Sequence, residues 1–137
     1  MSNTPRVSVV MGVYNAERYV EQTVRSVLAQ SFTEFEFIII DDGSSDGSLA
    51  ILRRLQSEDQ RIVIISRANT GIVGAALDGM AAARGQLIAR HDADDISHPQ
   101  RLELQVAYLD AHPEVVAVGS QMQIADPYLS PLEETRF

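Results

Sequence analysis

The sequence predicts an α/β fold with an open, mostly parallel sheet and helices on both of its faces. First, the candidate strands are short, unbroken apolar runs such as Phe35–Ile40, which are typical of strands buried on both sides. Second, segments with a helical spacing of apolar residues separate these runs. Third, 137 residues with 45% hydrophobic side chains suffice for a single domain with a real core.

The first half of the chain predicts two strands, each followed by a helix. Val7–Met11 is the first strand, and Asn15 is the expected N-cap of the helix that follows it. Phe35–Ile40 is the second strand, and the turn-rich stretch Asp41–Ser48 ends it. The apolar residues that mark the two helices are Val20, Val24, Val27 and Leu28, then Leu49, Leu52 and Leu55.

The second half predicts three further strands with a helix in each of the two intervals. The strands are Arg61–Ser66, Leu87–Arg90 and Val115–Val118. Pro99 suits the first turn of the second of these helices, and the pattern fades beyond Gly119. We therefore expect residues 1–119 to form the core and 120–137 an irregular segment. The expected buried faces are Ile72, Val73, Ala76, Leu77 and Met80, then Leu102, Val106 and Leu109.

Composition excludes several classes of protein. The absence of cysteine excludes a disulfide framework, a thiolate zinc site and a cysteine nucleophile. A net charge of -8 argues against a nucleic-acid partner, which requires a basic face. The longest apolar runs, Phe37–Ile40 and Ile62–Ile65, are far shorter than the roughly 20 residues of a membrane span. Met1–Arg6 is polar and is no signal peptide, so we expect a soluble, cytoplasmic chain.

Unusual polar residues follow four of the predicted strands. Right-handed crossovers place all strand-to-helix loops of a parallel sheet on one edge, where ligands bind. The glycine-rich fingerprints of dinucleotide-binding and P-loop proteins are missing from these loops. The sequence therefore predicts a different ligand site, built from the loops Gly12–Asn15, Asp41–Ser44, Arg67–Gly71 and His91–Asp95.

The loop after the fourth strand contains three carboxylates in four residues, Asp92, Asp94 and Asp95. Like charges at 4 Å repel by about 1 kcal/mol in water and about 4 kcal/mol at an intermediate dielectric, so a bound cation would stabilise them. Oxygen ligands favour Mg²⁺ or Mn²⁺ over zinc and leave coordination positions for a diphosphate. The alternative is a solvated acidic loop with an N-capping aspartate.

The other loops also leave two interpretations open. Asp42 suits a hydrogen bond from a base N–H or a ribose hydroxyl, but Asp-Gly pairs also make plain turns. Tyr14 suits stacking on a planar base, or packing under its own loop. Asn69 is a candidate nucleotide-sugar contact or a helix cap in a tight turn, and Arg67 suits either phosphates or the aspartates. His91 is a candidate neighbour of the metal.

In order and spacing, the motifs resemble those of the inverting family 2 glycosyltransferases, which have the GT-A fold. The matching stretches are Val7–Met11, Val13–Asn15, Ile40–Gly47, Asn69–Gly71 and Asp92–Asp95, followed by Pro99 and Arg101-Leu102. The resemblance implies that residues 1–119 bind a nucleotide sugar, commonly UDP-linked, for inverting transfer to an acceptor hydroxyl.

The resemblance also implies roles for single residues. Tyr14, next to Val13, would lie against the uracil, and Asp42 would bind its N3–H. Asp92 would contact the ribose or the metal, and Asp94 would be the direct ligand of Mn²⁺ or Mg²⁺. Glu17 matches a position that is often acidic in the family.

An inverting transfer also needs a general base for the acceptor hydroxyl. In the family this base lies many tens of residues after the Asp-x-Asp motif, so we expect it beyond Phe137. We expect the chain to be the donor-binding part of a longer enzyme that is peripheral at the inner face of the membrane. Its acceptor would be a saccharide or a lipid-linked saccharide.

Two alternatives stay open at this point. One is a non-catalytic nucleotide-binding module. The other is an aspartyl-phosphate hydrolase of the haloacid-dehalogenase type, because such enzymes also contain an Asp-x-Asp pair. That interpretation is weakened by Ile96, which stands where those enzymes usually have threonine, and by the position of the pair after the fourth strand.

Overall fold

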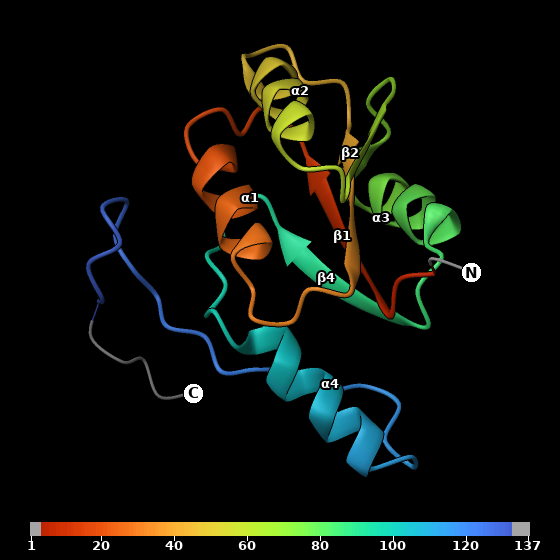
Figure 1. Ribbon diagram of the computed structural model, residues 1–137. Helices are drawn as coiled ribbons and strands as arrows, with labels where there is room; N and C mark the ends of the chain where they lie inside the picture. Colours follow the sequence, from red (N-terminus) through yellow and green to blue (C-terminus); the bar gives the residue numbers. More distant parts are fainter. Residues whose placement is uncertain (1–3, 133–137) are drawn as a thin grey trace. The chain divides into compact units, whose positions relative to one another are not determined.

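The computed structural model describes residues 4–132 and confirms the predicted α/β class (Figure 1). Four parallel strands form one sheet in the order β3-β2-β1-β4. The elements are β1 (Val7–Val13), α1 (Val20–Leu28), β2 (Phe35–Asp41), α2 (Ser48–Glu58), β3 (Ile62–Ser66), α3 (Gly71–Ala82), β4 (Leu87–Asp92) and α4 (Arg101–Ala111).

The strand register aligns the carboxyl ends of the central strands. Strand β1 lies between β2 and β4, with Val13 paired to Asp41 and Gly12 paired to Asp92. The loops that follow these strands therefore begin side by side at one edge of the sheet. This register is what brings the polar loops predicted from the sequence together.

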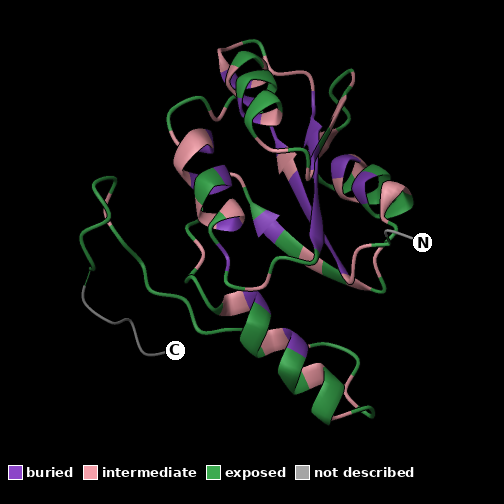
Figure 2. Ribbon diagram, in the orientation of Figure 1, coloured by how far each residue is buried: buried purple, intermediate pink, exposed green. Residues whose placement is uncertain are grey.

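Helices cover both faces of the sheet. Helices α1 and α2 contact each other on one face, and α3 packs against β1 and β2 on the other (Figure 1). Nearly every residue of β1 and β2 is buried, as the purple arrows in Figure 2 show. Helix α1 buries Val20, Val24 and Val27, three of the four residues that the sequence predicts. Among the described residues, no helix is long and apolar enough to cross a membrane.

The start of α1 differs from the prediction. The helix begins at Val20 with Tyr19 as its N-cap, not at Asn15. Asn15 has a φ of 49°, in the left-handed region that does not start a helix. Its side-chain oxygen accepts hydrogen bonds from the amides of Ser45 and Asp46, at 2.8 and 3.3 Å. Asn15 therefore joins two loops at the edge of the sheet.

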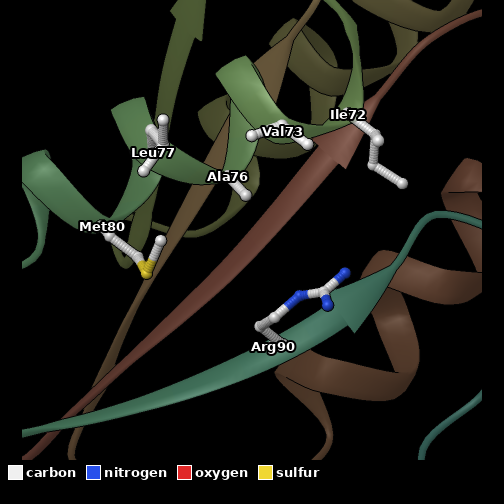
Figure 3. A pocket seen from close by; sticks show the side chains of 6 residues that line it. All are labelled: Ile72, Val73, Ala76, Leu77, Met80 and Arg90. Atoms are coloured by element: carbon white, nitrogen blue, oxygen red, sulfur yellow. The ribbon is translucent and has the colours of Figure 1, made fainter.

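The buried face predicted for α3 is wrong. Ile72, Val73, Leu77 and Met80 are exposed, and the helix instead buries Ala75 and Gly79. Small residues let this helix approach the sheet closely: a Cβ built on Gly79 would collide with a γ carbon of Val10. The exposed side chains, together with Arg90, line a shallow apolar groove between α3 and β4 (Figure 3).

The fifth predicted strand, Val115–Val118, is absent from the described residues. A strand persists only when its backbone pairs with a neighbour, and these residues have no ladder partner in the described chain. Residue contacts divide the chain into the units Met1–Glu103 and Leu104–Phe137, and α4 begins in the first. In the second, Ala125 and Pro131 form one antiparallel bridge. The boundary at residue 119 stays a prediction.

A buried acid, Glu36, lies near the amino ends of β1 and β2, at the opposite end of these strands from the polar loops. Glu36 is 4% exposed and accepts hydrogen bonds from the Ser8 hydroxyl at 2.6 Å and from the Arg84 amide at 2.8 Å. The Arg84 guanidinium also pairs with it at 2.8 Å. Burial alone would raise the pKa of Glu36, but the bonds from Ser8 and Arg84 lower it below its ordinary value.

Replacing Glu36 by glutamine should reduce the free energy of unfolding at pH 7 by about 2 kcal/mol, because charge-assisted bonds to a buried group are lost. Since folding lowers the pKa of Glu36, its contribution is complete above the unfolded value of about 4.3 and is lost as the pH falls through the folded value. Urea denaturation of the two proteins should therefore differ at pH 7 and converge in acid. Glu34→Gln, at an exposed position, is the control; a pH-independent difference would contradict the assignment.

Candidate functional site

A cavity of about 620 Å³ lies at the carboxyl ends of β1 and β4. This volume is within the range of small-molecule sites. Six residues predicted from the sequence line it together, namely Val13, Tyr14, Asp42, Asn69, Asp92 and Asp94. Glu17 and Arg67, which the sequence also singles out, are not among the lining residues.

Small residues create the floor of this cavity. Gly12 of β1 faces Ala75 of α3 so closely that a Cβ on the glycine would lie 3.2 Å from that of Ala75. Ala76 also lines the space. Larger side chains at these positions would fill the volume between the ends of the strands and the start of α3.

One wall presents an aromatic ring and backbone. The Tyr14 side chain is exposed (55%), so its ring is free to meet a planar ligand. Val13 is buried, and its carbonyl accepts a hydrogen bond from the Asp42 amide at 2.8 Å. Val13 therefore contributes shape and backbone to the cavity, and it also fixes the start of the next loop.

Asp42 is buried and holds the start of α3. Its Oδ1 accepts from the Thr70 amide at 3.0 Å and its Oδ2 from the Gly71 amide at 2.9 Å. The Arg67 guanidinium donates a third hydrogen bond, at 3.1 Å. The bond from Thr70, with those from Arg67 and Gly71, lowers the pKa of Asp42, so the carboxylate is charged at neutral pH. The first amides of α3 are thereby satisfied by the protein itself.

Arg67 pairs with two acids, one in the loop after β2 and one in α3. It contacts Asp42 at 3.1 Å and also forms an ion pair with Asp78 of α3. Of the two roles that the sequence leaves open for Arg67, pairing with aspartates is the one observed. Gly74 makes room for this side chain, because a Cβ there would lie 2.7 Å from the guanidinium.

Glu17 serves a structural contact between loops. Its carboxylate accepts a hydrogen bond from the Gly47 amide at 2.7 Å, and its own amide donates to Asp46 at 3.1 Å. Together with the bonds of Asn15, these contacts fasten the segment after β1 to the loop before α2. Glu17 thus positions the loop that carries Tyr14.

The end of β4 is strongly acidic. The Asp92 side chain is 60% exposed and lies 3.5 Å from Arg90, and Asp94 is also exposed. Burial, and then the neighbouring carboxylates Asp92 and Asp94, raise the pKa of Asp95. The part of this rise that comes from Asp92 and Asp94 reflects repulsion between like charges, which a bound cation would reduce.

The donor set fits a hard divalent cation that shares its ligands with a bound molecule. Within residues 4–132, no three His, Asp or Glu side chains are grouped as a ready metal site. Asp92 and Asp94 instead offer two exposed carboxylates on the cavity wall. Mg²⁺ is typically held by one or two carboxylates and completed by phosphate oxygens.

The sequence did not predict every lining residue, and Tyr19 and Ile72 are two examples. Tyr19 lines the cavity from just before α1, but a helix starting at Asn15 would have placed it within the helix. Ile72 was assigned to a buried helix face and instead reaches the cavity. The sequence signal for this was Gly71 at the first position of α3, because a glycine there leaves space at the start of the helix.

Comparisons with known proteins agree with this geometry. The family model described as "Glycosyl transferase family 2" matches residues 8–130. An uncharacterised glycosyltransferase of Haemophilus influenzae is 38% identical over 125 residues, covering 90% of this chain and 39% of that protein. Chondroitin synthase of Escherichia coli is 36% identical over 104 residues, covering 76% of this chain and 15% of the synthase. The chain spans less than half the length of the first relatives it matches.

Solved structures share the fold. S. aureus TarS residues 1–349 in complex with UDP aligns with a TM-score of 0.73 at 26% identity, covering 79% of this chain and 33% of that chain. The complex of the same protein with UDP-GlcNAc aligns with a TM-score of 0.74. A mannosyltransferase of Pyrobaculum calidifontis, in complex with GDP-Man and Mn²⁺, has a TM-score of 0.72 at 22% identity, covering 77% of this chain and 32% of that chain, and supports the fold alone.

Proposed function

The chain belongs to glycosyl transferase family 2, and we propose that it binds a UDP-sugar donor together with a divalent cation for inverting transfer to an acceptor hydroxyl. One observation carries the proposal: the loops after β1, β2, β3 and β4 place an aromatic ring, an amide and three carboxylates on one cavity. The complexes of TarS with UDP and UDP-GlcNAc support the choice of nucleotide.

The base end of the donor is assigned to Tyr14, Asp42 and Asn69. The exposed ring of Tyr14 offers a stacking surface for uracil. The carboxylate of Asp42 has about four acceptor positions, of which three are used within the described residues, so one remains for a base N–H. The Asn69 side chain lies on the same wall and suits the polar edge of the base or ribose.

The diphosphate end is assigned to the acidic wall. Asp94, with Asp92, is proposed to hold Mn²⁺ or Mg²⁺ against the diphosphate. The cation supplies Lewis-acid stabilisation of the negative charge that develops on the leaving nucleoside diphosphate. Without it, the carboxylates of Asp42, Asp92 and Asp94 would repel an anionic ligand. Arg90, also on this wall, offers a guanidinium to the phosphates.

The contacts to the acceptor are assigned to the part of the relatives that this chain does not match. The relatives extend well beyond the matched part, and an inverting transfer needs a general base placed against the acceptor hydroxyl. We therefore propose that this chain provides donor binding and that the base and the acceptor contacts come from that additional length. The proposed acceptor is a saccharide or a lipid-linked saccharide, and the proposed location is the cytoplasmic side of the membrane.

Calorimetric titration with UDP and UDP-GlcNAc tests the proposal. We expect UDP to bind at least tenfold more tightly with Mn²⁺ than with EDTA, because the cation removes the repulsion between ligand and carboxylates. Equal affinity in EDTA, or no binding at millimolar UDP with Mn²⁺, would contradict it. The family membership favours this function over an aspartyl-phosphate hydrolase, and hydrolysis of an aryl phosphate should accordingly be absent.

A further inference from the structure

We propose that a three-residue relay, His91–Ser97–Arg101, positions the acidic loop so that Asp92 and Asp94 can bind a cation. The inference rests on the proposed function, and it assigns the three residues as positioning residues that act through the acidic loop, although His91 also lines the cavity. The acidic loop is defined here as residues 92–98, between the end of β4 and the turn that starts α4.

The relay connects the strand end to the helix start through one hydroxyl. His91 is 6% exposed, and its Nε2 lies 2.7 Å from the Ser97 hydroxyl. The Arg101 guanidinium donates to the same hydroxyl at 3.1 Å, and its second nitrogen donates to the Arg90 carbonyl at 2.9 Å. Both ends of the acidic loop are therefore tied to one point.

The direction of each hydrogen bond follows from the partners. His91 Nδ1 lies 2.8 Å from the Asp92 carbonyl, and a carbonyl can only accept, so Nδ1 carries the proton. Nε2 of the neutral ring then accepts from the Ser97 hydroxyl, which leaves the hydroxyl oxygen to accept from Arg101. Every donor in this chain of bonds therefore has an acceptor. The bond from His91 Nδ1 holds the Asp92 carbonyl in place.

The other side of the acidic loop is fastened to α1. The Thr23 hydroxyl donates to the Ala93 carbonyl at 3.0 Å, and the Ser26 hydroxyl accepts from the Ser97 amide at 3.1 Å. Gln30 donates to the His98 carbonyl at 2.7 Å. The backbone on the N-terminal side of Asp94 is thus held at two successive carbonyls, while its carboxylate stays exposed toward the cavity.

This fixation counters the repulsion within the acidic loop. Three neighbouring carboxylates repel one another and so favour a conformation that spreads them apart. The relay and α1 instead hold the backbone where Asp92 and Asp94 face one cavity. Partners that orient metal ligands typically contribute 10- to 100-fold to metal affinity, so removing the relay should weaken cation binding without removing a ligand.

The test measures metal enhancement, the ratio of the UDP dissociation constant in EDTA to that in Mn²⁺, for the full chain by calorimetry. Ser97→Ala breaks the relay at its centre, and we expect the ratio to fall roughly tenfold. Ser97→Thr keeps the hydroxyl and should retain the wild-type ratio. Ser57→Ala removes a hydroxyl that donates to the Arg54 carbonyl on α2 and should leave the ratio unchanged.

Arg101→Lys is a second variant in case Ser97→Ala does not fold. Lysine keeps the charge but has no planar fork to reach both the Ser97 hydroxyl and the Arg90 carbonyl, so the ratio should again fall. The calorimetric stoichiometry reports the folded fraction and the dissociation constant reports the site, which separates loss of fold from loss of positioning. Wild-type ratios in both variants would overturn the inference, whereas a wild type without metal enhancement would overturn the proposed function.

Discussion

Asp94→Asn should weaken UDP binding in the presence of Mn²⁺ by about 100-fold, or about 2.8 kcal/mol. The proposed cation has only two carboxylate ligands from the protein, Asp92 and Asp94, so losing one charge removes a large part of its attraction to the site. In EDTA we expect the order of the two UDP affinities, variant and wild type, to be reversed or equal. There the variant should bind UDP at least as well as the wild type, because one repulsive charge on the cavity wall is gone.

Calorimetry in matched Mn²⁺ and EDTA buffers measures both effects. Glu114→Gln also converts a carboxylate to an amide, at an exposed position outside the cavity lining, and should leave both affinities unchanged. Retention of the full metal-linked affinity by Asp94→Asn would remove Asp94 from the metal site. Loss of affinity equally in both buffers would indicate a role in direct ligand contact instead.

Gly79→Val should lower the free energy of unfolding by roughly 3 kcal/mol and the melting temperature by about 10 °C. Helix α3 contacts the sheet through Gly79, and a side chain there collides with Val10 of β1. The collision is with the buried centre of the sheet, since Val10 is 3% exposed, so the helix must shift to accommodate it.

Ala81→Val is the matched control for this change. It introduces the same β-branched side chain into the same helix at an exposed position, and so shows what valine alone costs the helix without the collision. We expect a loss of well under 1 kcal/mol for the control. Similar losses in the two variants, measured by thermal and urea denaturation, would show that α3 does not depend on close contact at Gly79.

The order of the elements and the edge that carries the site were predictable from the sequence. Unbroken apolar runs predict buried parallel strands, and the rule of right-handed crossovers then brings the loops after them to one edge. The structure confirms four strands in this arrangement and places Tyr14, Asp42 and Asp94 on one cavity. That part depended only on local patterns and general topology.

The rest depended on contacts between distant residues. Apolar spacing predicts that α3 buries its largest side chains. Which face of the helix is buried depends instead on how closely the helix approaches the sheet, and the small residues Gly79 and Ala75 permit a short distance. Asn15 has the residue type of an N-cap, yet its oxygen is used by amides 30 residues away. Likewise, the partner of Arg67 could not be chosen until β2 and α3 were adjacent in space.

The loops at the edge of the sheet are held by side chains that bind backbone amides. Asn15 binds the amides of Ser45 and Asp46, and Asp42 binds those of Thr70 and Gly71. These amides should therefore exchange with deuterium slowly, unlike those of ordinary surface loops. A ligand entering such a cavity loses little affinity to the entropy of loop ordering, because the folded chain has already met that cost.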